Sequence, residues 1–203
     1  MTDLFKEKAR DWDVNEMVRE LSSAVGSAMM EHVPFDKEMR VMDFGAGTGL
    51  ISSKVAPLVK KIVAVDTSEA MLSKLAAKPE MEGRVEILCR DITERPIDDS
   101  FDLIMSAMAM HHVRDTARLI ESFARHLKPG GLIALADLDS EDGTFHPEDM
   151  EGIFHNGFDR DELRDLLGRH GFGSIHFYTA HTVKKDGKLF PVFLVTARKA
   201  YSS

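Results

Sequence analysis

The chain has a single cysteine and no long apolar run, and each absence excludes a class of protein. Cys89 is the only cysteine among 203 residues, so no disulfide can form within the chain. This favours a reducing, cytoplasmic setting. No apolar run reaches the roughly 20 residues of a membrane helix, and the first residues lack the apolar stretch of a signal peptide. We therefore expect a cytoplasmic protein with no membrane partner.

An excess of positive charge is also absent. Lysine and arginine together number 26 against 34 aspartates and glutamates, which gives a formal net charge of -8. An acidic surface repels the phosphates of nucleic acids and of anionic membranes. We therefore expect no nucleic-acid partner. The sequence leaves open whether the protein is a monomer or a homodimer.

Strand-like and helix-like patterns alternate along the chain from residue 40 onward. Short apolar runs typical of buried strands are followed by segments whose apolar residues recur every three or four positions. Near the end, Asp186-Gly187 separates two β-rich runs and predicts a hairpin. This alternation predicts an α/β fold with a Rossmann-like, doubly wound, mostly parallel sheet. The predicted strands are 40–44, 61–65, 84–88, 101–105, 132–138, 175–183 and 189–198, and the predicted helices are 50–59, 68–77, 115–126 and 159–169.

We predict a single domain over residues 1–203, because no linker is long enough to separate two domains. Long irregular inserts in compact domains tend to be functional, so the irregular segment after the fifth strand predicts a lid over the substrate. The predicted parts are an N-terminal helical cap (1–38), a ligand-binding core (39–138), a substrate-side insert (139–158), and a helix with a closing β-hairpin (159–203).

The glycine-rich turn after the first predicted strand is the most informative segment. Gly45, Gly47 and Gly49 allow positive φ angles and a close approach of a ligand to the backbone. The dinucleotide fingerprint G-x-G-x-x-G is incomplete, since Leu50 stands where its last glycine would be. Asp43, just before the turn, is a poor neighbour for a pyrophosphate and a good one for a cation. The turn therefore favours a nucleotide-like ligand with positive charge.

Two further acids follow the next predicted strands. Asp66 ends the second strand, where a carboxylate can accept hydrogen bonds from both hydroxyls of a ribose. Asp91 follows the third strand, where it can accept a hydrogen bond from an adenine amino group while Ile92 packs on the ring. Each acid also fits an ordinary capping or turn role. Because the carboxyl ends of parallel strands meet at one edge of the sheet, we predict that these acids form one nucleoside site.

Together these segments resemble the class I S-adenosylmethionine (SAM)-dependent methyltransferases, especially their small-molecule, UbiE-like (type 11) branch. The resemblance covers roughly residues 41–138 and rests on five segments in order: VMDFGAGTG, VAVDTSEAML, RDI, FDLIMSAMAMHHV and LKPGGLIALAD. It implies a seven-stranded sheet whose last hairpin strand runs antiparallel. It also implies SAM as the cofactor and methyl transfer by in-line displacement to a small-molecule substrate.

The resemblance further implies which residues hold the cofactor. By matched position, Asp66 would bind the ribose, and Asp91 with Ile92 would close over the adenine. Ala46 and Thr67 complete the predicted cofactor-binding set. The other members are Asp43, Gly45, Gly47 and Gly49 around the methionine part, Met71 against the adenine, and Ser106 with Ala107 beside the sulfonium and its methyl group.

Two histidines follow the fourth predicted strand, near the expected position of the methyl group. We predict His111 as the catalytic residue, a general base, although a histidine bonded to backbone at a helix start fits the same pattern. The residues predicted to contact substrate are Trp12, His112, His146 and Phe158, and for Trp12 and Phe158 a plain core position is the alternative. We expect no metal, since the spacing of the histidines and acids in 139–158 matches no standard ligand pattern.

Other functions remain open from the sequence. A protein that binds SAM for regulation without catalysis has the same binding residues. An NAD(P)-dependent oxidoreductase has a related sheet, but the incomplete glycine fingerprint and Asp43 argue against it. Methylation of protein or nucleic acid is less favoured, since no basic tract is present and no Asn-Pro-Pro-Tyr-type signature follows the fourth strand. The acceptor atom is not predicted.

Overall fold

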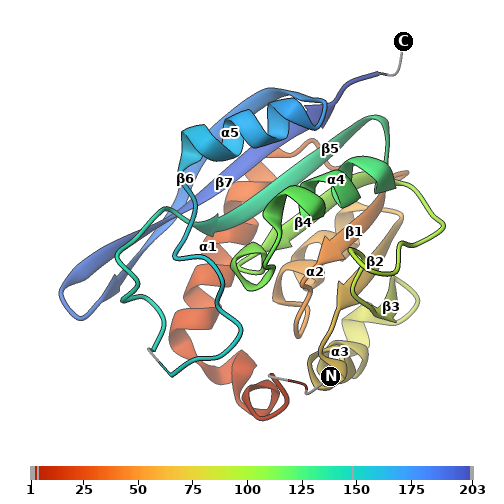
Figure 1. Cartoon of the computed structure of the whole chain (residues 1–203). Helices are drawn as coiled ribbons and strands as arrows, with labels where there is room; N and C mark the ends of the chain where they lie inside the picture. Colours follow the sequence, from red (N-terminus) through yellow and green to blue (C-terminus); the bar gives the residue numbers. More distant parts are fainter. Residues whose placement is uncertain (1–2, 4, 148, 202–203) are drawn as a thin grey trace.

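The computed structural model describes residues 3, 5–147 and 149–201, which contain a seven-stranded sheet flanked by helices (Figure 1). The strand order is β3-β2-β1-β4-β5-β7-β6. The first five strands pair in parallel, whereas β7 pairs antiparallel with both β5 and β6. This confirms the predicted Rossmann-like sheet and its closing hairpin. The strands are β1 (Arg40–Phe44), β2 (Lys61–Asp66), β3 (Val85–Cys89), β4 (Phe101–Ala107), β5 (Leu127–Leu138), β6 (Phe172–Lys185) and β7 (Lys188–Lys199).

Five α-helices cover the two faces of the sheet, because strands buried on both sides need an apolar layer on each. The helices are α1 (Glu16–His32), α2 (Leu50–Val55), α3 (Glu69–Ala76), α4 (Thr116–His126) and α5 (Arg160–Arg169). Five short 3₁₀ turns join them, namely η1 (Lys8–Arg10), η2 (Trp12–Val14), η3 (Ala56–Leu58), η4 (Pro79–Met81) and η5 (Met110–His112). These numbers refer to the described residues.

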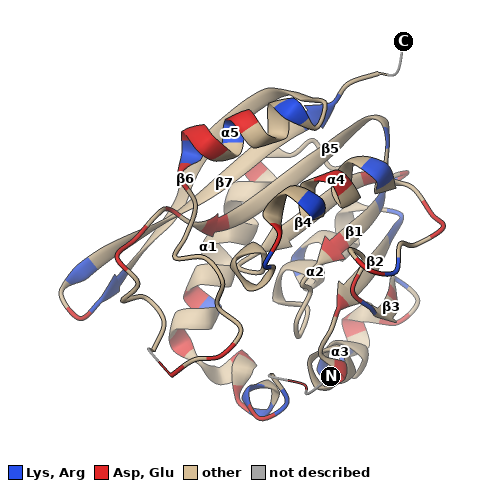
Figure 2. Cartoon of the chain, in the orientation of Figure 1, with Lys and Arg blue, Asp and Glu red and all other residues tan. Residues whose placement is uncertain are grey.

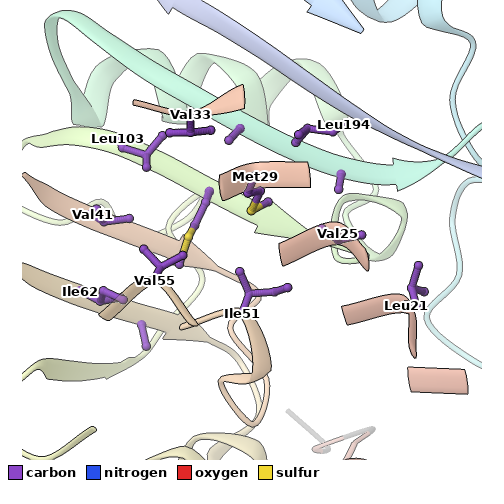
Figure 3. Close-up of a cluster of buried hydrophobic side chains, with 14 of the residues drawn as sticks. Leu21, Val25, Met29, Val33, Val41, Ile51, Val55, Ile62, Leu103 and Leu194 are labelled. Carbon is purple, nitrogen blue, oxygen red and sulfur yellow. The ribbon is translucent and has the colours of Figure 1, made fainter. Parts of the chain in front are cut away.

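Two apolar clusters hold these layers to the sheet. On one face, Val25 and Met29 of α1 pack with Val41 and Leu103 of the central strands (Figure 3). On the other face, Phe123 of α4 packs in a second cluster together with buried residues of α5. Full burial of one large apolar side chain contributes roughly 1.5–3 kcal/mol, so the two clusters fix the strands, and with them the loops at the strand ends.

Three helices begin directly after residues 68, 115 and 159, where the predicted helical segments start. The side chains of Ser68, Asp115 and Asp159 accept hydrogen bonds from backbone N–H groups in the first turns of α3, α4 and α5. Asn15 does the same for α1. Each cap satisfies donors that have no partner within the helix. The sequence pattern therefore located the starts of α3, α4 and α5 correctly.

Several boundaries differ from the prediction, and three of these differences have a clear physical reason or change an element. The helix predicted over 50–59 ends at Val55 and continues as a 3₁₀ turn, because Pro57 has no N–H to donate. The first helical region is broken into η1, η2 and α1. The strand β5 begins at Leu127, not at residue 132, since Leu127 pairs with Phe101 of β4 across an irregular register.

The insert over 139–158 is irregular, as predicted, and is fastened at both ends. Asp139 and Phe158 form an isolated parallel bridge, and the Arg160 guanidinium donates to both Asp139 oxygens at 2.7 and 2.8 Å. Gly157 has a left-handed backbone conformation with φ 76°, and a Cβ there would lie 2.1 Å from the Asp139 carbonyl oxygen. The base of the insert therefore leaves no room for a side chain at Gly157.

Within the described residues, no helix is both long and apolar enough to cross a membrane.

Candidate functional site

The glycine-rich turn connects β1 to α2 at the carboxyl edge of the sheet. Gly45 has φ 67°, and a Cβ there would lie 2.2 Å from the Ala109 Cβ atom, so only glycine fits this approach. The N–H groups of Gly45 and Ala46 donate to the Val65 carbonyl at 2.8 and 3.1 Å. At Gly47, by contrast, a Cβ would meet nothing within 4 Å. The turn is therefore packed against the protein on one side and open on the other, as a ligand cradle needs to be.

Asp66 lies at the end of β2, directly beside this turn. Its Oδ2 atom accepts a hydrogen bond from the Gly47 N–H at 2.8 Å, and its Oδ1 atom accepts one from the Ser68 N–H at 2.9 Å. Burial raises the pKa of this carboxyl against the lowering effect of those backbone donors. A carboxylate oxygen has two lone pairs, so each can accept a further hydroxyl. The adjacent Thr67 is exposed.

Asp43 lies beneath the turn and is only 3% exposed. Its Oδ2 atom accepts a hydrogen bond from the Ser52 hydroxyl at 2.5 Å. Burial raises the pKa of Asp43 to about 7, and the nearby Asp66 charge adds to this. Contact between Asp43 and the methionine part of the ligand stays a prediction.

The third acid and its neighbours lie beyond β3. Asp91 is half-buried, and its Oδ1 atom accepts from the Thr93 N–H and hydroxyl at 2.8 and 2.7 Å. Ile92 is fully buried in the apolar cluster under α4, and Met71 of α3 is 2% exposed. Their contacts with an adenine ring stay predictions.

A histidine–aspartate pair lies at the ends of β4 and β5. His111 is 1% exposed, and its Nδ1 atom lies 2.7 Å from Oδ1 of Asp137, which is fully buried. Asp137 also accepts from the backbone N–H groups of His111 and Leu138, at 3.2 and 2.8 Å. Because a carboxylate only accepts, Nδ1 of His111 carries a proton in this contact, and Nε2 is the ring nitrogen left for another partner.

The segment that carries His111 also contacts the glycine turn. Ala109, two residues earlier, is the residue against which Gly45 packs. Met108 holds φ 55° while its N–H donates to the Ala136 carbonyl at 2.8 Å, which turns the chain sharply after β4. Ser106, one of the predicted cofactor residues, has a buried hydroxyl with no partner among the described residues, and Ala107 follows it half-buried. The two halves of the site therefore adjoin.

Two further histidines surround His111. The ring centroids of His111 and His112 lie 4.2 Å apart, and those of His111 and His146 lie 4.9 Å apart. Burial lowers the pKa of both His112 and His146 to about 4, and the neighbouring histidines add to this. His146 belongs to the insert, so the structure unites predicted residues that are far apart in the sequence.

Aromatic rings border these histidines. Phe5 contacts His112 edge-on, with ring centroids 5.1 Å apart, and the ring centroids of Trp12 and Phe5 lie 6.2 Å apart. Trp12 is thus one ring removed from the histidines. Phe158 packs against His155 and the core under α5 and makes no ring contact with His111, His112 or His146 among those described. Its prediction as a substrate residue has no support from this packing.

The N-terminal segment covers the glycine turn, through residues that the sequence analysis did not single out. The Thr48 hydroxyl donates to Oδ1 of Asp13 at 2.5 Å, and Oδ2 of Asp13 pairs with the Lys78 ammonium at 2.9 Å. Asp3 accepts from the Ser68 hydroxyl at 3.0 Å. Asp137 was likewise missed, although its place at the end of the fifth strand, after LKPGGLIALA, was a usable signal.

Two hollows lie at the opposite edge of the sheet, with volumes of about 180 and 360 Å³. They are lined by residues near the beginning of β5 and the end of β7, such as Leu132 and Arg198. None of the predicted site residues lines either one. Ligands of open α/β sheets bind outside the carboxyl ends of the strands, so neither hollow is the favoured site. The described residues contain no group of three or more potential metal ligands placed to hold an ion.

Comparison with known proteins gives a family match. The methyltransferase domain family matches residues 42–135. An uncharacterized methyltransferase of Schizosaccharomyces pombe is 31% identical over 135 residues, which cover 59% of this chain and 48% of the relative. A demethylmenaquinone methyltransferase of Clavibacter sepedonicus is 34% identical over 99 residues, which cover 48% of this chain and 40% of the relative. The chain thus spans about half the length of the curated relatives that it matches.

Solved structures share the fold over nearly the whole chain. A chain from the Haloferax volcanii complex between the Trm112 methyltransferase activator and its partner has a TM-score of 0.79 at 18% identity, covering 99% of this chain and 100% of that one. The complex of DhpI with S-adenosylhomocysteine (SAH) has a TM-score of 0.76 at 20% identity, covering 98% and 95%. At these sequence identities, the similarity to the solved structures shows that the fold is shared.

Proposed function

Residues 42–135 belong to the class I SAM-dependent methyltransferase family, and from this premise we propose that the chain transfers a methyl group from SAM to a small molecule. The observation that carries the proposal is the contact between Gly45 and Ala109. This contact joins the glycine turn, whose Gly47 N–H donates to Asp66, to the segment that leads into His111. A nucleoside held by the turn would therefore present its sulfur to a buried base.

The residues present fit SAM. The open side of Gly47 leaves room for the methionine part, while Asp66 retains acceptor capacity for the two ribose hydroxyls. Asp91 has a carboxylate oxygen, Oδ2, with no hydrogen bond among the described residues, which suits an adenine amino group. The buried Ser106 hydroxyl also has no partner among the described residues, and in this proposal it lies beside the sulfonium group of SAM.

SAM, when bound, supplies a methyl group already activated on a sulfonium. The chain then has to hold the acceptor in line with that methyl group and exclude water, for which orientation alone can contribute up to about 7–11 kcal/mol. His111 is placed to take the acceptor's proton at Nε2, because Asp137 holds the proton on Nδ1 and stabilises the imidazolium that forms. The acceptor's proton thus has a defined destination.

A small-molecule acceptor fits the surroundings of His111. The N-terminal segment contacts His112 through Phe5, and the insert contacts His111 through His146. In this proposal, these two segments leave little space for a polymer beside the histidines. Figure 2 shows Lys and Arg interspersed with Asp and Glu along the ribbon, without a long basic segment for nucleic acid. The proposal keeps the chain as a single domain, monomeric or homodimeric, with 139–158 as the substrate-side insert.

The first prediction tests the cofactor. Titration of the protein with SAH by calorimetry is expected to give one-site binding, and Asp66→Ala is expected to weaken it by about a hundredfold. Two hydrogen bonds to a charged group, at about 1.5 kcal/mol each, would be lost.

Asp98→Ala is the matched control, since Asp98 is an exposed aspartate outside the site. Equal affinity of Asp66→Ala and Asp98→Ala would remove Asp66 from the site. Binding of SAH without any labelled product from a metabolite extract and methyl-labelled SAM would contradict the transferase proposal and favour a SAM-binding regulator.

A further inference from the structure

Two imidazole nitrogens in the site are buried from solvent and have no bound partner among the described residues. The Nε2 atoms of His111 and His146 have no hydrogen-bond partner among the described residues. The two rings come from different segments, η5 and the insert, yet their centroids lie 4.9 Å apart. A buried polar atom without a partner costs about 1–3 kcal/mol, so two of them on neighbouring rings indicate a ligand.

The charged groups near His111 and His146 make contacts of their own. Asp137 uses both oxygens on His111 and backbone N–H groups. Lys185 donates its ammonium to the Phe145 carbonyl at 2.6 Å, and Lys8 is exposed over the Phe5 ring. The neighbouring His112 donates Nδ1–H to the Gly152 carbonyl, 2.8 Å away. Asp137 and Lys185 are therefore already hydrogen-bonded, whereas Lys8 is exposed and Oε1 of Glu141 is buried with no partner among the described residues.

The Nε2 atoms of the two rings can offer a ligand one hydrogen-bond acceptor and one donor. The pKa of His146 is lowered to about 4, mainly by burial. His111 has its proton fixed on Nδ1 by Asp137. A neutral imidazole pair offers one bare nitrogen to accept a hydrogen bond and one ring that can donate or accept. A hydroxyl group, which donates one hydrogen and accepts another, matches such a pair.

We propose that His111 and His146 bind one uncharged hydroxyl group between their Nε2 atoms, and that the methyl acceptor is a neutral phenol or enol. This rests on the proposed function and names its substrate class. An imidazole removes a proton far more readily from a phenol, with a pKa of about 10 as in tyrosine, than from an aliphatic alcohol. The edge-on rings of Phe145 at His146 and Phe5 at His112 suit a planar acceptor.

The step balances without a further reactant. The acceptor oxygen forms a bond to the methyl carbon while the S–CH₃ bond breaks, and the sulfur keeps the electron pair, which leaves SAH. The hydroxyl proton moves to Nε2 of His111, and Asp137 stabilises the resulting imidazolium until the proton leaves for solvent. His146 holds the oxygen in place and is not protonated.

The test uses the full chain saturated with SAH and nitrogen-15 NMR of the histidine rings. Phenol is the probe, with anisole, benzoate and benzylamine as its methylated, anionic and cationic counterparts. Phenol is expected to shift the Nε2 signals of His111 and His146 saturably and to bind about tenfold more tightly than each counterpart, since one hydrogen bond contributes about 1 kcal/mol. His146→Gln is expected to weaken phenol about tenfold while SAH affinity is unchanged, and His176→Gln, an exposed control on β6, is expected to change neither.

Tighter binding of benzoate or benzylamine than of phenol would overturn the inference, as would phenol binding that is indifferent to His146→Gln. If His146→Gln unfolds, the signals of the two rings in the unmodified protein decide alone. Failure of SAH itself to bind would overturn the proposed function and this inference with it. Normal SAH binding with no phenol-induced shift would overturn only the inference.

Discussion

At the residue scale, Asp43 is a carboxyl group with almost no solvent contact and one hydrogen bond from Ser52. Burial in a medium of low dielectric disfavours its charged form, and so its pKa rises to about 7. Asp137 is buried as well, but it accepts three hydrogen bonds, two of them from backbone N–H groups. The two acids therefore suit different tasks: Asp43 can respond to a cation, and Asp137 can hold a histidine ring.

The second prediction concerns Asp43 and pH. The ammonium group of SAH favours the ionised carboxylate, so binding lowers the pKa of Asp43 and releases a proton. SAH affinity is therefore expected to rise as the pH increases through about 7 and to level off above it. Asp43→Asn should remove this rise. Calorimetry in buffers of different ionisation enthalpy measures the released proton, and an affinity independent of pH between 6 and 8 would contradict the account.

The third prediction concerns Asp137. Asp137→Asn replaces an acceptor with an amide, so Nδ1 of His111 no longer has a carboxylate to hold its proton. We expect methyl transfer to fall by a factor of about a hundred or more, because His111 is no longer held in the tautomer in which Nε2 can act as the base. SAH affinity should stay unchanged, because Asp137 contacts His111 and not the glycine turn. A parallel loss of SAH affinity would mean that Asp137 is merely structural.

At the scale of the elements, α3 connects the stability of the fold to the cofactor edge. Ser68 caps this eight-residue helix through the Met71 N–H at 3.2 Å, and its own N–H donates to Asp66. Its hydroxyl also donates to Asp3 of the N-terminal segment. One residue thus joins β2, α3 and the segment that covers the glycine turn. The cap was predictable because serine before a helix is a local signal, whereas the contact with Asp3 is not local.

The fourth prediction is a change in stability from the loss of that cap. Ser68→Ala is expected to lower the free energy of unfolding by about 1 kcal/mol, since an orphan N–H of the first turn is left without its partner. Ser73→Ala is the control, because Ser73 is exposed in the same helix and donates only to the Glu69 carbonyl. Urea unfolding of both variants measures the difference. Equal stabilities would show that the Ser68 cap contributes nothing.

At the scale of the whole molecule, seven strands bring four segments to one edge of the sheet. The turn after β1, Asp66 after β2, Asp91 after β3 and His111 after β4 are all at carboxyl ends of parallel strands. The sequence predicted this edge, because strand ends and glycine turns are local patterns and parallel pairing follows from their alternation. The confirmed strand order is the physical reason that residues 20 to 66 positions apart lie at one edge of the sheet.

The residues that sequence reasoning missed depend on contacts between distant elements. Asp137 became a candidate only when β5 placed it against His111, since its place at a strand end does not by itself show which side chain it contacts. His146 was named from its irregular surroundings, but its distance from His111 depends on how the insert folds back. The extension of β5 to Leu127 depends on pairing with Phe101, which overrides the turn signal of Pro129 and its glycines.

The fifth prediction is the most direct test of the central claim, that one edge of the sheet holds both the nucleoside and the base. A crystal structure of the protein with SAH is expected to show the ribose hydroxyls on Asp66, the adenine beside Asp91, and the sulfur facing His111. Density for SAH in one of the hollows near Leu132 and Arg198, with the glycine turn unoccupied, would contradict the account.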